Sequence, residues 1–168
     1  TRMTTLTLNM VVCNEEARLA EAIAHARQYV DYVVVVVQAS TDHTLEIAHR
    51  LADRVIEHPC LGFSEPSREA ALLASPDGWV LNLDADERLT AEALEEIRQR
   101  FGSPGGPGAD GFAFPRKTYF LDRWIMHGGW YPQHKVRLFR RAAGRIGGNP
   151  AHPAAEIDGK VAELRGDI

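Results

Sequence analysis

The stretch WVLNLDADE, residues 79–87, joins a run of apolar side chains to three carboxylates. Residues 79–83 predict a buried strand that runs directly into Asp84, and Asp86 follows after one intervening residue. Carboxylates this close repel each other unless solvent, a cation or a basic neighbour relieves the repulsion. Such oxygen ligands suit Mg²⁺ or Mn²⁺, which usually also take phosphate oxygens from a substrate. The alternative is a solvated turn and helix cap at residues 86–88, and this stretch alone leaves both open.

Strands and helices alternate on the amino-terminal side of this stretch. Three strands are predicted before it, at residues 5–12, 33–37 and 54–57. The middle one consists of five valines, which favours a central strand covered on both faces. Apolar side chains at helical spacing predict helices between the strands and at residues 65–75, and the expected N-caps of the first and fourth helices are Asn14 and Thr90. The alternation predicts an α/β fold of three layers, αβα, with a mostly parallel central sheet.

The alternation stops at the glycine- and proline-rich segment GSPGGPGAD, residues 102–110. Beyond it, residues 111–117 and 135–139 predict two further strands on either side of an aromatic segment. The length of 168 residues fits one domain with a substantial core, and we expect a single domain.

The composition is that of an ordinary soluble domain, with 45% hydrophobic and 25% charged residues. A net charge of −4, from 19 basic and 23 acidic residues, does not suggest a nucleic-acid partner. Cys13 and Cys60 have no metal-ligand spacing and form no disulfide framework, which favours a reducing compartment. The longest apolar run, residues 33–37, is too short to span a bilayer, and the expected location is the cytoplasm.

Ligands of open parallel sheets bind at the carboxyl ends of the strands. Three segments should therefore meet at one edge of this sheet. They are residues 13–15 after the first strand, the turn that ends in Asp42 after the second, and residues 84–87 after the fourth.

These segments, in this order and spacing, resemble the family 2 glycosyltransferases, and most of all the bacterial branch that includes lipopolysaccharide core β-glucosyltransferases. The motifs that carry the resemblance are Asn14-Glu15-Glu16, Ser40-Thr41-Asp42-x-Thr44, WxxNxDADE at 79–87, GGWYPxxKxRLFR at 128–140 and Asp158-Gly159-Lys160-Val161. The resemblance covers nearly the whole chain and implies the GT-A fold, which binds a nucleotide-diphospho-sugar. It implies a nucleotide-sugar-binding half at residues 1–101 and an acceptor-side half at 111–168, in a family whose members usually continue further.

The resemblance also assigns roles to individual residues. Asp86 matches the metal ligand of the family's DxD motif, and Asp84 matches the residue that helps to place the metal and the ribose. The positions implied to line the nucleotide-sugar are Val11, Cys13, Glu15, Asp42, Arg68, Asp84 and Ala85, with Arg68 replacing a missing phosphate-facing cation. The positions implied on the acceptor side are Trp130, Tyr131, Lys135 and Arg137. Taken singly, the two aromatic residues also fit a core, and the cations, Arg116 and Lys117 among them, also fit a solvated surface.

Four positions depart from the family pattern. Val37 and Gln38 stand where the family has an acidic residue that contacts the base, and residues 66–68, Pro-Ser-Arg, replace Gln-Lys/Arg-Asn. Gln133 replaces an aspartate. Pro153 replaces the glutamate that, in an inverting transferase, takes the proton of the acceptor hydroxyl. The candidate catalytic bases are therefore Glu156, Asp158 and His152.

The first hypothesis is a metal-dependent, inverting hexosyl transfer from a nucleotide-sugar, most readily a UDP-sugar, to a carbohydrate or lipid-linked acceptor of the cell envelope. Mg²⁺ or Mn²⁺ is the expected cofactor, and a lipid-linked acceptor fits peripheral contact with the inner face of the membrane. The second hypothesis is a non-catalytic domain of this fold that binds a nucleotide, a glycan or a protein partner, which the four departures favour. A nucleotidyltransferase, the third, normally has a glycine-rich basic loop after the first strand, and residues 13–16 are not one.

Overall fold

The computed structural model of the chain describes residues 4–120, 123–125, 133–149 and 152–168. The helices are α1 (Leu19–Ala26), α2 (Thr44–Leu51), α3 (Glu65–Ala74) and α4 (Ala91–Gly102), with a short 3-10 helix, η1, at Arg141–Ala143. The strands are β1 (Leu6–Val12), β2 (Tyr32–Gln38), β3 (Arg54–His58), β4 (Trp79–Asn82), β5 (Gly111–Arg116), β6 (Tyr119–Phe120), β7 (Arg123–Trp124), β8 (Gln133–Arg140), β9 (Gly144–Asn149), β10 (His152–Ile157) and β11 (Val161–Glu163). Within the described part of the chain, no helix is long and apolar enough to cross a membrane.

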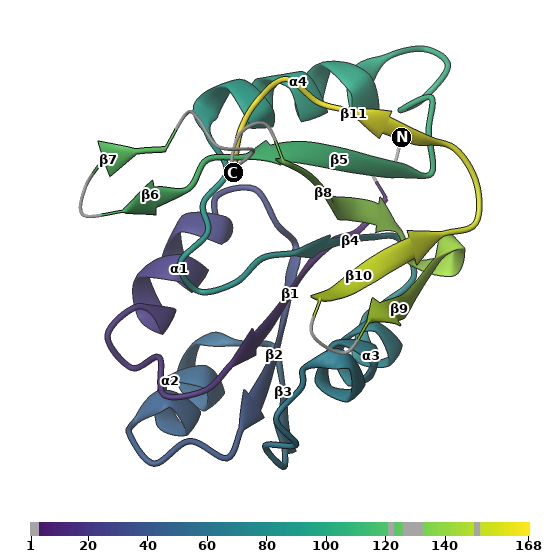
Figure 1. Ribbon diagram of the computed structural model, residues 1–168. Helices are drawn as coiled ribbons and strands as arrows, with labels where there is room; N and C mark the ends of the chain where they lie inside the picture. The colour runs from purple at the N-terminus through teal and green to yellow at the C-terminus, as the bar shows by residue number, and fades with distance from the viewer. Residues whose placement is uncertain (1–3, 121–122, 126–132, 150–151) are drawn as a thin grey trace.

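The central sheet has seven strands in the order β11-β5-β8-β4-β1-β2-β3 (Figure 1). β1 lies parallel to β2 and to β4, and β2 lies parallel to β3. β8 runs antiparallel to both of its neighbours, β4 and β5, whereas β11 is parallel to β5. The predicted α/β fold, with a mostly parallel sheet and the first, second and fourth strands at its centre, is therefore confirmed.

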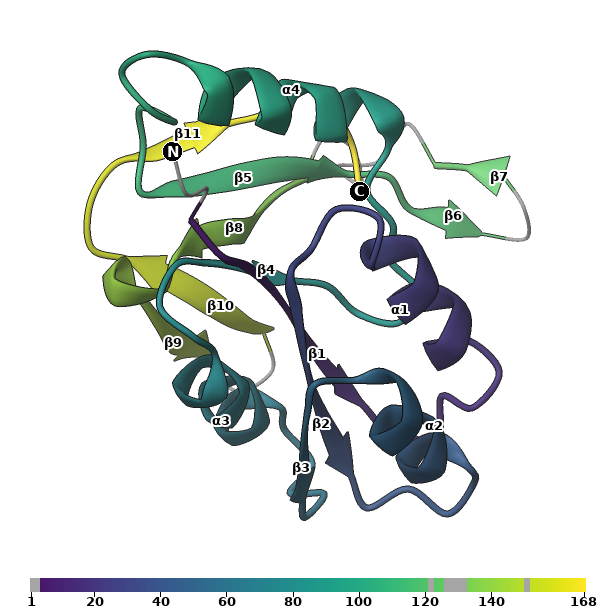
Figure 2. The same cartoon turned by 180° about the vertical axis from the view of Figure 1, so that it is seen from behind.

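The five valines of β2 explain why this strand lies inside the fold. Val33, Val35 and Val37 belong to the main core, which they share with the buried faces of α1, α2 and α4. Val34 and Val36 pack on the other face of the sheet with Ala71 of α3. Each of the five is at most 3% exposed. The strand buries both faces, as the continuous apolar run predicted, and the helices form layers on either side (Figure 2).

The two predicted N-caps have different outcomes. The Thr90 hydroxyl accepts a hydrogen bond from the backbone N–H of Ala93 at 3.2 Å, which confirms Thr90 as the N-cap of α4. The prediction for Asn14 was wrong, because α1 begins at Leu19 with Arg18 in the N-cap position. Asn14 has a left-handed backbone, with φ of 51°, which asparagine adopts more readily than most residues. Its side chain bonds the neighbouring loop instead.

A hairpin covers the sheet beside α3. β9 and β10 pair antiparallel over residues 144–157. Ile146 and Ile157 of this hairpin pack in one cluster with Leu72 of α3 and Phe139 of β8. This hairpin, the short β6–β7 pair and β11 were not predicted from the sequence. A strand such as GRIGGN lacks the alternating apolar side chains on which strand prediction depends.

Candidate active site

The carboxyl ends of β1, β2 and β4 share one edge of the sheet because the three strands are parallel. Asp84 comes two residues after the end of β4 and lies at this edge, as the sequence predicted. The loops after β1 and β2 join there, since the backbone N–H of Asn14 donates to Ser40 Oγ at 3.0 Å. We call this region, residues 13–16, 38–44 and 84–88, the carboxylate edge.

Two arginines hold the carboxylate of Asp84. Arg68 Nη2 lies 2.8 Å from Asp84 Oδ1, and Arg137 Nη2 lies 3.5 Å from Asp84 Oδ2. Burial by itself would raise the pKa of Asp84, but the attraction of Arg68 and Arg137 outweighs it and holds that pKa below its ordinary value. Both oxygens thus face cations of the protein, so Asp84 is not a free metal ligand in this structure.

Glu87 anchors the loop that follows β4. It is 6% exposed and accepts a hydrogen bond from the backbone N–H of Asp84 at 2.9 Å. Arg137 Nη2 lies 2.6 Å from Glu87 Oε1, and Arg116 Nε lies 3.7 Å from the same oxygen. This role of Glu87 was not predicted. The available signal was the spacing, because an acidic side chain at i+3 can bond back to the backbone N–H of residue i.

Asp86 is the exposed carboxylate of the motif. It borders a pocket of about 380 Å³ that Arg88, Arg116 and Lys117 also line. A divalent ion often uses one or two carboxylates together with phosphate oxygens of a substrate, and Asp86 fits that arrangement. The described residues contain no group of three or more His, Cys, Asp or Glu side chains that could hold a metal by themselves.

Hydrogen bonds join the loop after β1 to the loop after β2 in what we call the two-loop corner, residues 14–16 and 40–44. Asn14 Oδ1 accepts from the backbone N–H of Thr41 at 2.8 Å, and Thr44 Oγ1 accepts from that of Glu15 at 2.8 Å. Asp42 Oδ1 accepts from the hydroxyl and the backbone N–H of Thr44 at 2.5 and 3.0 Å. These bonds, the one from the hydroxyl above all, lower the pKa of Asp42. Asp42, predicted to bind the nucleotide-sugar, is thus engaged in shaping the loops.

The other residues predicted to line the nucleotide-sugar differ in exposure and in their contacts. Cys13 is exposed at the carboxylate edge. Glu15 pairs with Arg18, with Glu15 Oε2 and Arg18 Nη1 3.3 Å apart. Val11 packs on the α3 face of the sheet. Ala85 is 4% exposed and its methyl group lies in the main core, so only its backbone could meet a ligand.

Two of the four departures from the family pattern meet in the structure. Gln38, the last residue of β2, donates from Nε2 to Ser67 Oγ at 2.9 Å. Ser67 is fully buried, so this bond ties the carboxyl end of β2 to α3. A neutral pair therefore stands where the family pattern has an acidic and a basic side chain.

Of the four residues predicted for the acceptor side, Lys135 and Arg137 belong to the described part of the chain, and they differ in exposure. Trp130 and Tyr131 lie outside the described residues. Lys135 is exposed on β8. Arg137 is buried, with 13% of its side chain exposed, between the carboxylates of Asp84 and Glu87. It stabilises the loop after β4, and its assignment to the acceptor side stays a prediction.

The three predicted bases belong to β10 and the residue after it. Glu156 pairs with Arg145, their Oε2 and Nε atoms being 3.3 Å apart, and Asp158 follows directly. Both are at the open end of the β9–β10 hairpin, next to the end of β8 that pairs with the start of β4. They therefore lie at the opposite end of β4 from Asp84, and the structure does not bring them to the carboxylate edge. His152 begins β10 at the closed end of the hairpin, and its side chain is outside the described part of the chain.

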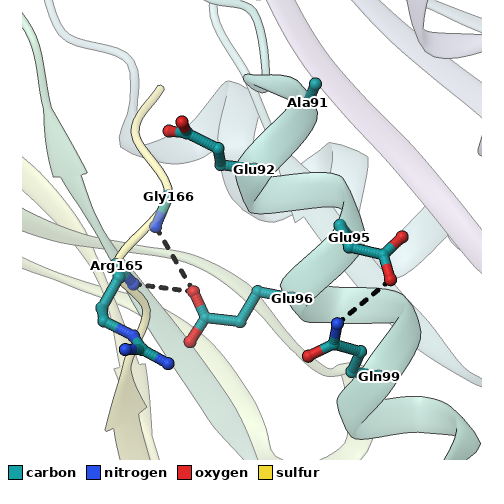
Figure 3. A pocket seen from close by; sticks show the side chains of 7 residues that line it. All are labelled: Ala91, Glu92, Glu95, Glu96, Gln99, Arg165 and Gly166. Carbon is teal, nitrogen blue, oxygen red and sulfur yellow. Dashed lines mark hydrogen bonds between the residues drawn. The ribbon is translucent and has the colours of Figure 1, made fainter.

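A wider depression lies on the outer surface of α4 (Figure 3). Its volume is about 560 Å³, and acidic side chains of α4 and the segment after β11 line it. Glu96 Oε2 accepts from the backbone N–H groups of Arg165 and Gly166 at 2.8 and 3.3 Å, and Glu95 accepts from Gln99 (Figure 3). Glu96 thus holds the segment after β11 against α4 at the border of the depression.

The sequence model of glycosyl transferase family 2 matches residues 7–155. The chain belongs to glycosyl transferase family 2. This match includes β1 to β9 and the first part of β10, and with them the whole carboxylate edge. Membership confirms the resemblance drawn from the sequence motifs.

Two curated relatives show how much of a family 2 protein is present. An uncharacterized glycosyltransferase of Rickettsia felis is 43% identical over 94 residues, which are 56% of this chain and 33% of that protein. The lipopolysaccharide core biosynthesis glycosyltransferase LpsC of Rhizobium meliloti is 26% identical over 162 residues, 92% of this chain and 58% of LpsC. In these matches the chain spans about a third of the Rickettsia relative and just over half of LpsC.

Two solved structures share the fold of this family 2 chain. S. aureus TarS 1–349 in complex with UDP has a TM-score of 0.60 at 19% identity, covering 83% of this chain and 47% of that one. Glucosyl-3-phosphoglycerate synthase from Mycobacterium tuberculosis, in complex with Mn²⁺, UDP and glucosyl-3-phosphoglycerate, has a TM-score of 0.52 at 21% identity, covering 68% and 44%. At these identities the likeness establishes the GT-A fold of the chain.

Proposed function

We propose that this family 2 chain transfers a sugar, with inversion at the anomeric carbon, from a nucleotide-sugar to a carbohydrate or lipid-linked acceptor. The observation that carries the proposal is Asp86, an exposed carboxylate at the carboxyl edge of a GT-A sheet, beside a pocket lined by three basic side chains. Glu87 and Asp167 also line this pocket but pair with Arg137 and Lys117, so Asp86 is its one carboxylate without an ion pair among the described residues. Such a carboxylate beside Arg88 and Arg116 suits a metal ion bound together with a diphosphate. UDP in TarS and in the mycobacterial synthase supports a UDP-sugar as donor, and the similarity to LpsC supports an envelope polysaccharide as product.

Mg²⁺ or Mn²⁺ is the proposed cofactor. Asp86 would hold the ion together with phosphate oxygens of the donor, and the ion would neutralise charge on the departing diphosphate. Arg88 and Arg116, which line the same pocket, would face the remaining phosphate charge. Arg68 and Arg137 form ion pairs with Asp84 and so stabilise the loop that carries Asp86.

Transfer also needs a group that takes the proton of the acceptor hydroxyl as its oxygen attacks. Glu156 and Asp158, at the far end of β4, are poorly placed for this step. β8 runs away from the carboxylate edge and β9 turns back, so the closed end of the hairpin is directed towards that edge (Figure 1). We therefore propose His152, at that closed end, as the base among the three candidates.

Replacing Asp86 tests the metal proposal. Asp86→Ala should remove the Mn²⁺-dependent part of UDP binding and leave the fold intact, because the side chain is exposed. Calorimetric titration with UDP, with and without Mn²⁺, measures the first effect, and thermal unfolding checks the second. Asp77→Ala, at an aspartate whose side chain is 99% exposed before the start of β4, should bind like the parent. If Asp86→Ala binds UDP and Mn²⁺ as tightly as the parent, Asp86 is only a turn residue.

A second candidate function is binding without catalysis. The pairing of Asp84 with Arg68 and Arg137, and the distance of Glu156 and Asp158 from the carboxylate edge, favour it. A panel of nucleotide diphosphates and UDP-sugars separates the two functions. Metal-dependent binding followed by release of UDP to an acceptor supports transfer, whereas binding of a nucleotide, glycan or protein with no turnover supports the non-catalytic domain.

A further inference from the structure

One buried carboxylate near the carboxylate edge has no hydrogen-bond partner in the described part of the chain. Glu65 is the first residue of α3, and both of its carboxylate oxygens are buried without a hydrogen-bond partner among the described residues. An unpaired carboxylate in a protein interior loses its hydration and gains nothing in return, which makes such groups uncommon. Glu65 is therefore retained at a cost to the stability of the folded chain.

The contacts of α3 place Glu65 near the predicted donor site. Ser67, two residues later, bonds Gln38 at the carboxyl end of β2, and Arg68 bonds Asp84. Arg68 and Leu72 follow Glu65 at i+3 and i+7, so they lie on the same side of the helix. Leu72 packs against side chains of β4 and β8. Glu65 therefore projects from the first turn of α3 on the side where the loop after β4 begins.

Among the described residues, no basic side chain forms an ion pair with this carboxylate. Arg68, its nearest basic neighbour along the helix, bonds Ser64 Oγ through Nε at 3.4 Å and Asp84 through Nη2 at 2.8 Å. The positive end of the α3 dipole lowers the cost of a buried negative charge, but no N–H of the helix bonds these oxygens. A divalent ion would need several further oxygen ligands, and the described residues hold no such cluster.

We infer that the Glu65 carboxylate binds vicinal hydroxyl groups of the nucleotide-sugar, on either its ribose or its transferred sugar; this rests on the proposed function. A carboxylate accepts two charge-assisted hydrogen bonds from a diol, which would satisfy both orphaned oxygens. A phosphate would be repelled by the same carboxylate, so the neutral, hydroxyl-bearing part of the donor is the matching chemistry. Nε of Arg137, also buried without an acceptor, is a group that a hydroxyl oxygen can satisfy as well.

The test compares the chain with its Glu65→Gln variant, which keeps the shape of the side chain and removes its charge. Dissociation constants are measured for UDP, UDP-glucose and UDP-N-acetylglucosamine in the presence of Mn²⁺, and urea unfolding is measured without ligand. We expect affinity to fall about 10- to 100-fold, the loss for hydrogen bonds to a charged group. Stability should stay level or rise, because an unpaired buried charge is removed. Glu69→Gln, at an exposed position on the same helix, should change neither.

The outcomes separate the possibilities. An equal loss for UDP and both UDP-sugars assigns Glu65 to the ribose, and a loss confined to the UDP-sugars assigns it to the transferred sugar. Unchanged affinities in Glu65→Gln, or a fall in affinity together with a fall in stability, would overturn the inference and leave the proposed function standing. Binding of Mn²⁺ alone that disappears in the variant would overturn it in favour of a cation site. A parent chain that binds none of the three nucleotides would overturn the proposed function and this inference with it.

Discussion

Asp84, Asp86 and Glu87 lie within four residues of one another and have three different surroundings. Asp84 faces Arg68 and Arg137, Glu87 is buried against Arg137, and Asp86 is exposed. The sequence predicted that these acids form a site, because carboxylates at a buried strand end need compensation. It could not predict which of them is free, because Arg137 comes from a strand far along the chain and no local spacing reveals that contact.

Replacing Arg137 should lower the free energy of unfolding more than replacing an arginine at the surface. Arg137→Met leaves Glu87 and Asp84 partly buried with one cation fewer, and removing one partner from a buried ion pair typically costs about 3 kcal/mol or more. The free energy of unfolding from urea titration measures the loss. Arg145→Ala removes an exposed pair with Glu156 and should change it by about 0.5 kcal/mol or less. Equal effects of the two substitutions would contradict the burial argument.

The two-loop corner forms because two neighbouring elements, β1 and β2, end at the same edge of the sheet. β1 and β2 are parallel, so their following loops start side by side, and the backbone groups of each bond side chains of the other. Both strands were predictable from their apolar runs. The meeting of the two loops was predictable as well, because parallel strands end at the same edge of the sheet. The hydrogen bonds between the loops were not, because the sequence favours Asn14 as a helix cap and Asp42 as a ligand, whereas both side chains bond within the corner.

The pKa of His43 depends on its contact with Glu16 in this corner. The Glu16 carboxylate accepts a hydrogen bond from the His43 ring, which raises the pKa of His43. The backbone N–H of His43, and after it the ring, donate to the same carboxylate and lower the pKa of Glu16. The stabilisation from protonated His43 is complete below its unfolded pKa of about 6.5 and is lost as pH rises through the raised folded value. A proton NMR titration should give His43 a midpoint above about 6.5, falling back towards that value in Glu16→Gln. Identical midpoints in both proteins would disprove the contact.

At the scale of the whole molecule, residues 161–168 join the sheet to the layer of helices that covers it. β11 pairs with β5, and the segment after it passes between α4 and β5. There the backbone carbonyl of Asp167 accepts from Thr90, and that of Ile168 accepts from the backbone N–H of Lys117. The alternating first half was predictable by periodicity, but this closure was not, because VAE is too short to give a pattern.

Gly166 lies in close contact with α4 within the segment after β11. A methyl group at this position would meet the backbone of Ala93 in α4. Gly166→Ala should therefore lower the free energy of unfolding by about 1–3 kcal/mol, as overpacking does, measured by urea unfolding. Gly105→Ala, at a position where an added methyl group would meet nothing within 4 Å, provides the control and should be nearly neutral. A Gly166→Ala protein as stable as that control would mean that the segment is free to move away from α4.

The sheet order also has a consequence for how the chain is made. β4 lies between β1 and β8, and β8 follows β4 only after the whole of α4 and β5. On the ribosome, β1 to β4 emerge before β8 has been synthesised, so a half-sheet β3-β2-β1-β4 that pairs at this stage has β4 at its edge. Until then β4 is an edge strand, and its unpaired N–H and C=O groups can pair with another extended chain. The strand at the middle of the finished sheet is thus an edge strand in the growing chain, until β8 pairs with it.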